Sequence, residues 1–469
     1  MELGSLKRVH CVGIGGIGMS AIAKYLKVKG VTVTGSDSAH SEITHELIAL
    51  GIPVAVPYAQ SGVPRMADLL IYSEAVPTEN PDREAAKSRD VPERSGGEFL
   101  GILSAGMKTV AIAGTNGKST TTAMVGLILE AAGVDPTIIV GSKVPSLPMG
   151  NVRVGASEWL VLEADEYRAK FLQYAPYLAA ITNIEADHFD FYSGIDEITK
   201  AFQQFIEHVP ESGIVILNAD DPISRDDLQL TVPPVTYGFN GSASLVAEDI
   251  VVQAGRQRFK VRHTEGHGKV LGEITLRIPG CFNVMNALCA TAVGLSLGVR
   301  FDVIADTLGR FPGIWRRFEY VGKVPQRVLP AREPDRPVVI SDYGHHPTAI
   351  TGTIAAAREF YPGRRIVLLF QPHQHTRTAR LFDQFAAALR HPDVAVISDV
   401  YAVSGREEGE TVSSADLAAA ANREGAQALY GGDVDASAQT LRSHLRPGDV
   451  VIVMGAGNVD RVARELVRT

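Results

Sequence analysis

Short apolar segments alternate with longer amphipathic segments along most of the 469-residue chain. Apolar runs of about five residues are typical of buried parallel strands, and helical spacing of apolar residues is typical of surface helices. The segments predicted as strands are 9–12, 31–35, 69–72, 109–113, 160–163, 179–183, 214–218, 338–341, 365–370, 394–399 and 450–454. The segments predicted as helices are 19–29, 121–132, 283–297 and 348–360. This alternation predicts an α/β protein built on parallel sheets.

Two boundaries and one change of pattern divide the chain into three predicted domains. A glycine-flanked stretch at 101–106 precedes a new strand, and the Pro-Gly pair at 312–313 marks a linker. Between 236 and 279 the segments become short and β-like, which predicts a small antiparallel flap. The predicted domains are a Rossmann-like domain at 1–106, a central P-loop ATPase-like domain with a parallel sheet and the flap at 107–317, and a Rossmann-like C-terminal domain at 318–469.

Composition adds little to the fold but excludes several classes of function. A net charge of −8 provides no basic footprint for nucleic acid or for an anionic membrane. The three cysteines fit neither a disulfide framework nor a structural zinc site, which indicates a reducing compartment. No uncharged apolar run is long enough to span a bilayer, and the first eight residues lack an apolar signal segment. We therefore expect a cytoplasmic protein that binds no nucleic acid and does not insert into a membrane.

The first glycine loop, Gly-Ile-Gly-Gly-Ile-Gly at 13–18, lies between a predicted strand and a predicted helix. Backbone N–H groups and the positive end of the helix can face a diphosphate there. Asp37, at the end of the next strand, can accept a hydrogen bond from a ribose hydroxyl. This motif alone leaves a nicotinamide or flavin enzyme, another nucleotide-binding protein, and a simple packing turn as open alternatives.

The second glycine loop, Gly-Thr-Asn-Gly-Lys-Ser-Thr at 114–120, also connects a strand to a helix. Its first glycine lies two residues closer to the second than in the G-x-x-x-x-G-K-[ST] template. The chemistry is retained, because Lys118 can neutralise the β and γ phosphate oxygens and the Ser119 hydroxyl can bind magnesium. The loop therefore predicts binding of ATP with magnesium.

Two acidic strings follow strands of the central domain, Glu-Ala-Asp-Glu-Tyr at 163–167 and Asn-Ile-Glu-Ala-Asp-His-Phe-Asp at 183–190. Ligands collect at the carboxyl ends of strands in open parallel sheets. Oxygen ligands with one imidazole suit magnesium or manganese better than zinc. Together with the phosphate loop, the strings predict a metal site.

A histidine cluster is predicted in the third domain, in the strings Asp-Tyr-Gly-His-His-Pro at 342–347 and Gln-Pro-His-Gln-His-Thr-Arg-Thr at 371–378. Each string follows an apolar strand, so both should lie at one edge of the sheet. A zinc site, histidines that satisfy loop backbones, and a polar pocket for a zwitterion are the open alternatives. The pocket is favoured, with Arg377 offering a fork to a carboxylate.

These strings, together with Arg-Arg-Phe-Glu at 316–319, resemble the Mur ligases of peptidoglycan synthesis over nearly the whole chain. The opening Gly-Ile-Gly-Gly-Ile-Gly-Met-Ser and the Phe-Gln-Pro-His-x-x-Thr-Arg-Thr string are similar to the members that join L-alanine to UDP-N-acetylmuramate. The resemblance implies an ATP-dependent ligase that acts through an acyl phosphate. It implies that the first domain binds the UDP-sugar, the second ATP and the third the amino acid, in a monomer or weak homodimer.

The resemblance also implies roles for single residues. UDP-sugar binding is expected of Gly13, Gly15, Gly16, Gly18, Met19, Ser20, Asp37 and Ser73. ATP binding is expected of Gly114, Thr115, Asn116, Gly117, Lys118, Ser119, Thr120, Asn286, Arg317 and Asp342. Amino-acid binding is expected of Tyr343, His346, His373 and Arg377, and magnesium binding of Ser119, Glu163 and His188. The residues expected to be catalytic are Lys118, His188, His345, His373 and Arg377.

The chain departs from the family pattern at four places: Asn116 and Phe282 replace histidines, Gln374 replaces an arginine beside the alanine site, and Val-Pro-Tyr-Ala at 56–59 stands where a Gly-His pair is usual. The substitution at Gln374 bears on amino-acid preference. A recycling ligase that attaches a preformed peptide to UDP-N-acetylmuramate is therefore an alternative. A nicotinamide oxidoreductase and a catalytically silent nucleotide-binding regulator are alternatives from other classes.

Overall fold

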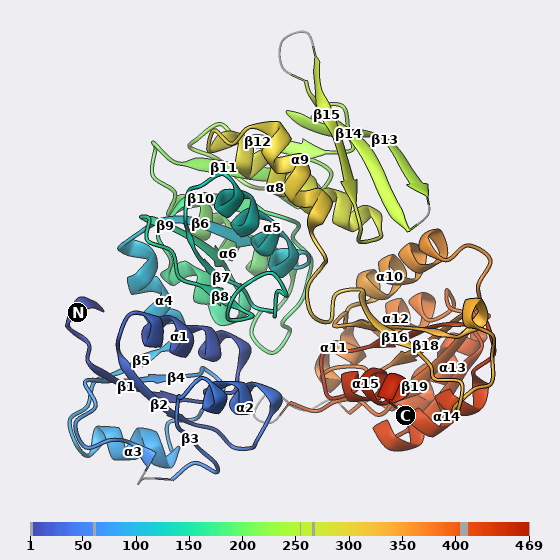
Figure 1. The fold of residues 1–469 in the computed structure, drawn as a ribbon, viewed down its shortest axis with the longest axis horizontal. Coiled ribbons are helices and arrows are strands. Elements are labelled where there is room, and N and C mark those ends of the chain that lie inside the picture. The colour runs from blue at the N-terminus through green and yellow to red at the C-terminus, as the bar shows by residue number, and fades with distance from the viewer. Residues whose placement is uncertain (1–2, 60–61, 254, 265–267, 404–410, 469) are drawn as a thin grey trace. The chain divides into compact units, whose positions relative to one another are not determined.

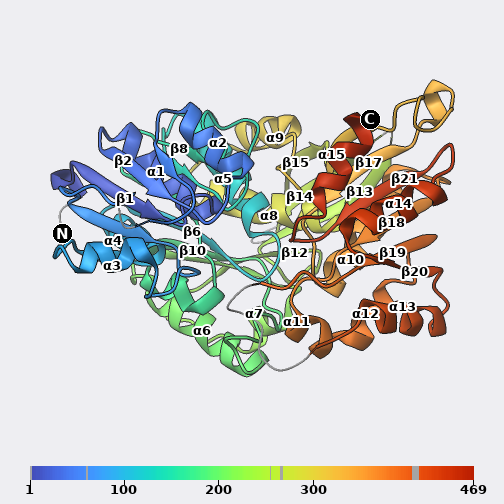
Figure 2. The same ribbon diagram turned by 90° about the horizontal axis from the view of Figure 1, so that it is seen from below.

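The computed structural model describes residues 3–59, 62–253, 255–264, 268–403 and 411–468. Its contacts divide the chain into two compact units. The first unit comprises Met1–Ile184, Ile198–Leu245 and Cys289–Ile304. The second comprises Glu185–Glu197, Val246–Leu288 and Ala305–Thr469. Figures 1 and 2 together label the helices and strands of both units.

The N-terminal sheet of the first unit is parallel throughout, in the order β3-β2-β1-β4-β5. Its strands are β1 (Arg8–Val12), β2 (Thr32–Ser36), β3 (Val54–Ala55), β4 (Leu69–Tyr72) and β5 (Glu93–Ser95). Its helices are α1 (Ile17–Val28), α2 (Glu42–Ala49), α3 (Pro81–Lys87) and α4 (Gly96–Ala105), after a short 3-10 helix (Leu3–Ser5). Helices α1 and α2 cover one face of the sheet and α3 the other (Figures 1 and 2).

The central sheet follows the order β12-β11-β10-β6-β9-β7-β8, and all of these neighbours are parallel except β7 and β8. Its strands are β6 (Lys108–Ala113), β7 (Thr137–Ile139), β8 (Val152–Arg153), β9 (Trp159–Glu163), β10 (Pro176–Ile181), β11 (Ile214–Asn218) and β12 (Val235–Gly238). The helical segments are α5 (Lys118–Ala131), a 3-10 helix (Tyr167–Gln173), α6 (Ile195–Glu207) and α7 (Pro222–Asp226).

Residues 236–238 of the predicted flap belong instead to β12, which is parallel to β11. The rest of the flap is confirmed as a ribbon in the order β15-β14-β13, with β14 and β15 antiparallel. It consists of β13 (Leu245–Gln253), β14 (Arg256–His263) and β15 (Lys269–Leu276), and is followed by α8 (Cys281–Ser296) and α9 (Phe301–Arg310). Buried and exposed residues alternate along β14, as expected for a ribbon with one covered face.

The third sheet has the order β16-β17-β21-β18-β19-β20, with β16 antiparallel to β17 and the other neighbours parallel. Its strands are β16 (Glu319–Lys323), β17 (Val338–Asp342), β18 (Ile366–Phe370), β19 (Val394–Ser398), β20 (Ala428–Gly432) and β21 (Val450–Met454). Its helices are α10 (Pro347–Phe360), α11 (His375–Arg380), α12 (Phe382–Ala388), α13 (Ser414–Arg423), α14 (Val434–His444) and α15 (Asp460–Arg468), with a 3-10 helix at Glu333–Asp335.

Alternate residues of the third sheet enter two separate apolar cores. Phe370 and Ile452 pack into one core with Phe385, whereas Leu369 and Val453 belong to the other core. Strands buried on both faces explain the uninterrupted apolar runs in the sequence. The predicted α/β class with three sheets is confirmed, while the domain bounds remain predictions. Among the described residues, no helix has the length and apolar character that crossing a membrane requires.

A buried histidine in β1 makes the stability of the N-terminal sheet depend on pH. His10 is fully buried with its Nδ1 2.8 Å from Thr34 Oγ1, and burial lowers its pKa from 6.5 to about 4. The unfolded chain therefore binds more protons, and stability falls as pH decreases from 6.5 towards 4, by roughly 3 kcal/mol at pH 4. Amide exchange of β1 at pH 7 and 4.5, corrected for intrinsic rates, measures this loss. In His10→Gln the pH dependence should largely disappear; an unchanged dependence would contradict the assignment.

Candidate functional site

The phosphate loop lies between β6 and α5, at the carboxyl edge of the central sheet. Gly117 precedes α5 with a φ of 85°, a left-handed conformation that favours glycine. A Cβ atom on Gly114 would collide with Thr182 Oγ1. The end of β10 holds the loop in place, since Asn183 accepts hydrogen bonds from the N–H groups of Thr115 at 2.9 Å and Asn116 at 3.0 Å. The loop is thus preorganised at the start of a helix, where anions bind.

Lys118 is held by carbonyl and carboxylate oxygens. Its Nζ donates to Gly114 O at 2.5 Å and to both Glu166 carboxylate oxygens at 2.8 and 3.0 Å. Burial by itself lowers the pKa of Lys118, but Glu166, Asp165 and Glu163 outweigh burial and raise this pKa. Lys118 is therefore charged, as a phosphate ligand must be. Glu166 lies within an acidic string that the sequence singles out, although it is absent from the predicted site.

Ser119 and Glu163 are brought together as predicted. Ser119 Oγ donates to Glu163 Oε1 at 2.9 Å, and Glu163 Oε2 accepts from the Gly141 N–H at 2.6 Å. A Cβ atom on Gly141 would lie 2.7 Å from Glu163 Oε1, so the close contact between residue 141 and the Glu163 carboxylate requires glycine. A hydroxyl beside a carboxylate provides the hard oxygen donors that suit magnesium. His188 belongs to the second unit, and its place in the metal site remains a prediction.

In the second unit, Arg377 forms a buried ion pair with Asp187. Arg377 Nε donates to Asp187 Oδ1 at 2.7 Å, and the two side chains are only 3% and 6% exposed. Burial raises the pKa of Asp187, but Arg377, His188 and His345 together hold this pKa well below its usual value. Arg377 Nη1 also donates to His373 O at 3.1 Å. Nε and Nη1 are thus engaged within the second unit, and the contact of Arg377 with an amino acid remains a prediction.

The histidines around Arg377 have different environments. His346 is the N-cap of α10, as expected if these histidines satisfy loop backbones. Its Nδ1 also lies 3.3 Å from Glu185 Oε2. Burial and the neighbouring Arg377 hold the pKa of His345 well below its usual value, so His345 is neutral near pH 7. The ring of His373 stacks on Tyr401 at 5.5 Å. Within the described ranges, no third ligand converges on these histidines, so the zinc alternative gains no support.

Three further residues are expected at the nucleotide: Arg317 precedes β16, Asp342 ends β17 and Asn286 lies in α8. The Arg317 guanidinium lies 4.9 Å from the centre of the Tyr343 ring. Asp342 is buried and accepts from the N–H groups of Phe318 at 2.8 Å and Gly344 at 2.7 Å, so its carboxylate organises the linker. In α8, Asn286 Nδ2 donates to Asn283 Oδ1 at 3.2 Å. The ATP contacts of these residues remain predictions.

Hydrogen bonds to nearby residues fix the conformation of the first glycine loop. Gly13 has a φ of 73°, and its N–H donates to Ser36 O at 2.9 Å. Asp37 Oδ2 accepts from the Gly15 N–H at 2.8 Å, so this carboxylate supports the turn. Ser20 is fully buried and donates to Ile17 O at 2.8 Å. The UDP-sugar contacts of these residues and of Gly16, Gly18, Met19 and Ser73 remain predictions.

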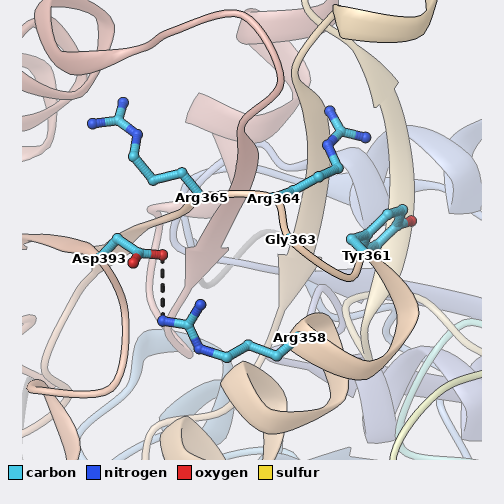
Figure 3. A pocket seen from close by; sticks show the side chains of 6 residues that line it. All are labelled: Arg358, Tyr361, Gly363, Arg364, Arg365 and Asp393. Atoms are coloured by element: carbon cyan, nitrogen blue, oxygen red, sulfur yellow. Dashed lines mark ion pairs between the residues drawn. The ribbon is translucent and has the colours of Figure 1, made fainter.

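Where β18 begins, Figure 3 shows a pocket lined by Arg358, Tyr361, Gly363, Arg364, Arg365 and Asp393. Arg358 reaches Asp393 at 3.3 Å, while Arg364 and Arg365 point away from each other (Figure 3). Arg364 donates to Gly448 O, and Arg365 pairs with Asp449 at 2.8 Å. The guanidinium groups thus tie together the starts of strands and do not converge on a ligand. The polar loops at the carboxyl edges are the candidate site.

A charged lysine in a glycine loop, on an α/β scaffold with three sheets, defines a nucleotide-dependent phosphoryl-transfer enzyme. The Mur ligase catalytic-domain model matches residues 8–108, the Mur ligase middle-domain model residues 112–294, and the Mur ligase glutamate ligase domain model residues 316–457. The chain belongs to the Mur ligase family.

Individual relatives are similar over almost their whole length. The UDP-N-acetylmuramate–L-alanine ligase of Aromatoleum aromaticum is 40% identical, with 98% of both chains covered. The enzyme of the same name from Caldanaerobacter subterraneus is 37% identical over 100% of this chain and 98% of the relative. The crystal structure of the Thermotoga maritima UDP-N-acetylmuramate-alanine ligase superposes with a TM-score of 0.83 at 28% identity, covering 99% and 98% of the two chains. A murein peptide ligase from Psychrobacter arcticus, 24% identical with a TM-score of 0.73 and 98% of both chains covered, shares the fold.

The ion pair of Asp187 and Arg377 provides a test of the second-unit site. Arg377→Met should leave a buried unpaired carboxylate and destabilise this unit by about 3–5 kcal/mol. Adding Asp187→Asn should restore part of the loss, because the uncompensated charge is then removed. Urea unfolding of the two single variants and the double variant measures the coupling. Strictly additive losses would mean that the two groups do not interact.

Proposed function

We propose that this chain joins L-alanine to the lactyl carboxylate of UDP-N-acetylmuramate and converts ATP to ADP and phosphate. The observation that carries the proposal is the contact between Ser119 and Glu163 beside the charged Lys118, which suits phosphoryl transfer to a carboxylate. The choice of substrates is supported by the relatives of that name, which align over the full length of the chain.

The first step activates the carboxylate, which is otherwise unreactive because its oxygen is a poor leaving group. A lactyl carboxylate oxygen bonds to the γ-phosphorus, and the bond from this phosphorus to the ADP oxygen breaks. Lys118 neutralises charge on the phosphate oxygens, and the glycine loop orients the phosphates. Ser119, Glu163 and His188 are the residues expected to hold magnesium, which when bound supplies further neutralisation of phosphate charge.

In the second step, the amine of alanine attacks the acyl carbon. The bond between this carbon and the bridging oxygen then breaks, phosphate leaves with that oxygen and the electron pair, and the nitrogen loses a proton to a base. The tetrahedral intermediate carries negative charge that needs a cation or hydrogen-bond donors. His345 is neutral and does not supply this charge. We assign it to Arg377, whose position Asp187 holds, and we retain His373 as the candidate base.

We also propose that the enzyme works in the cytoplasm, where ATP is abundant. Cys11, Cys281 and Cys289 are free thiols, which accords with a reducing compartment.

Phosphate release from ATP with UDP-N-acetylmuramate and magnesium tests the proposed activity, with L-alanine, glycine, L-serine or the cell-wall tripeptide as acceptor. Release should depend on L-alanine. Dependence on the tripeptide would instead identify the protein as a recycling ligase. No release with any acceptor would refute the substrate assignment.

In the same assay, Lys118→Ala should reduce turnover by at least about 100-fold, because a preorganised positive charge is lost. Binding of UDP-N-acetylmuramate, measured by calorimetry, should be retained. Lys260→Ala is the matched control, since Lys260 forms an exposed pair with Asp249 in the flap. Equal activity of both variants would contradict the role of Lys118.

Gln374 provides a separate test of amino-acid recognition. It is 3% exposed, and its Nε2 has no hydrogen-bond partner among the described residues. Gln374→Met should raise the KM for L-alanine about tenfold or more, because a hydrogen bond to a charged carboxylate contributes roughly 1.5–3 kcal/mol. Gln374→Arg should lower this KM, since it adds a positive charge.

The matched control for both changes is Gln204→Met on the exposed side of α6, which should leave the KM for L-alanine unchanged. If both Gln374 variants also retain the wild-type KM, Gln374 does not contact the amino acid.

A further inference from the structure

A loop of the central domain contacts both Glu163, the predicted magnesium ligand, and α1, the helix that follows the first glycine loop. This bridging segment, residues 141–151, connects β7 to β8. At one end the Gly141 N–H donates to Glu163 Oε2 at 2.6 Å. At the other end, β8 lies beside α1 in both views (Figures 1 and 2). One segment therefore contacts elements of the two predicted nucleotide sites.

Asn151 makes the principal contact with α1. Its side chain is completely buried, and Nδ2 donates to Ile17 O at 2.7 Å and to Ser20 Oγ at 3.0 Å. Its Oδ1 accepts from Lys24 Nζ at 2.9 Å, and this ammonium group also donates to Met149 O at 2.9 Å. The buried amide thus has both of its N–H donors satisfied. Such a fully bonded polar network specifies one orientation of the groups that it joins.

A second contact of the bridging segment lies nearer the surface. Lys143 Nζ donates to Glu42 at 2.8 Å and to Glu46 at 2.5 Å, both on α2. Glu42 is 71% and Glu46 38% exposed, and ion pairs with exposed partners contribute little to stability. The buried contacts of Asn151 are therefore the ones that define the orientation of α1.

We infer that Asn151 is a positioning residue for the ligation, because it fixes the helix of the first glycine loop to the segment that holds Glu163. The lactyl carboxylate and the γ-phosphate must meet at bonding distance, and they are bound by different domains. A fixed separation between the two loops is therefore a condition for attack. This kinetic consequence rests on the proposed function, whereas the contact itself can be tested without it.

The test uses Asn151→Asp in the full chain, a nearly isosteric change that removes both donated hydrogen bonds and keeps Oδ1 for Lys24. We expect kcat to fall at least tenfold, because small misplacements of reacting groups slow a reaction strongly. Calorimetric affinities for UDP and for ADP with magnesium, each bound within one domain, should stay within about threefold of wild type. Asn422→Asp is the matched control, because Asn422 Nδ2 donates to Ala428 O in the third domain.

A purely structural role predicts a different result. In that case both affinities and the melting temperature would fall with kcat, and assays well below the melting temperature would restore kcat. A second variant, Lys24→Met, removes another bond of the same network. Lys24→Met should likewise lower kcat and leave both affinities within about threefold of wild type, because Lys24 fixes the Asn151 amide that holds α1. Wild-type kcat in Asn151→Asp, or parallel loss of both affinities, would overturn the inference.

Hydrogen exchange separates failure of this inference from failure of the proposed function. In Asn151→Asp, exchange should accelerate at least tenfold at residues 17–25 and 141–151, and remain unchanged at residues 118–131. This readout requires no turnover, so it applies even if wild type releases no phosphate. Unchanged exchange at residues 17–25 would show that Asn151 does not hold α1 and would overturn the inference.

Discussion

Parallel hydrogen bonding forces neighbouring strands to end at the same edge of a sheet, and the site depends on this constraint. In the central sheet β10, β6 and β9 are neighbours, so the loop with Lys118, the carboxylate of Glu163 and the end of β10 meet at one edge. The middle residues of these strands are apolar and buried, so the polar residues that form the site lie at the ends of the strands. The same rule gathers the polar strings that follow β17 and β18 at one edge of the third sheet.

Both units use a buried carboxylate to hold a cation. Glu166 is 1% exposed and holds Lys118, and Asp187 is 6% exposed and holds Arg377. An isolated charge in such surroundings would shift its pKa and become neutral, whereas a paired charge stays ionised. Chemistry that moves a phosphoryl group and then stabilises an oxyanion needs fixed positive charges. In the proposed reaction these pairs keep Lys118 and Arg377 charged and in place, whereas a buried ion pair by itself is weak evidence for stability.

Polar contacts between elements far apart in the sequence organise the first unit. Gly141 and Asn151 are ten residues apart in one segment, yet their partners are Glu163 and the start of α1. Asp37 holds Gly15 in the same way across 22 residues. These contacts bury groups that must be hydrogen-bonded, so each permits few alternative arrangements. The two glycine loops are therefore preorganised before any ligand binds.

The sequence by itself determined the strands buried on both faces, the two glycine loops, the acidic strings and the family, because each depends on residues that are local in the chain. It did not reveal β3, β5, β7, β8, β16 or β20, which are short or lack an apolar run and pair only because a neighbouring strand is present. It also did not reveal that Asp187 holds Arg377, that His346 caps α10, or that Asn151 contacts α1. Those contacts join residues up to 190 positions apart, so only the tertiary arrangement decided which buried polar group meets which partner.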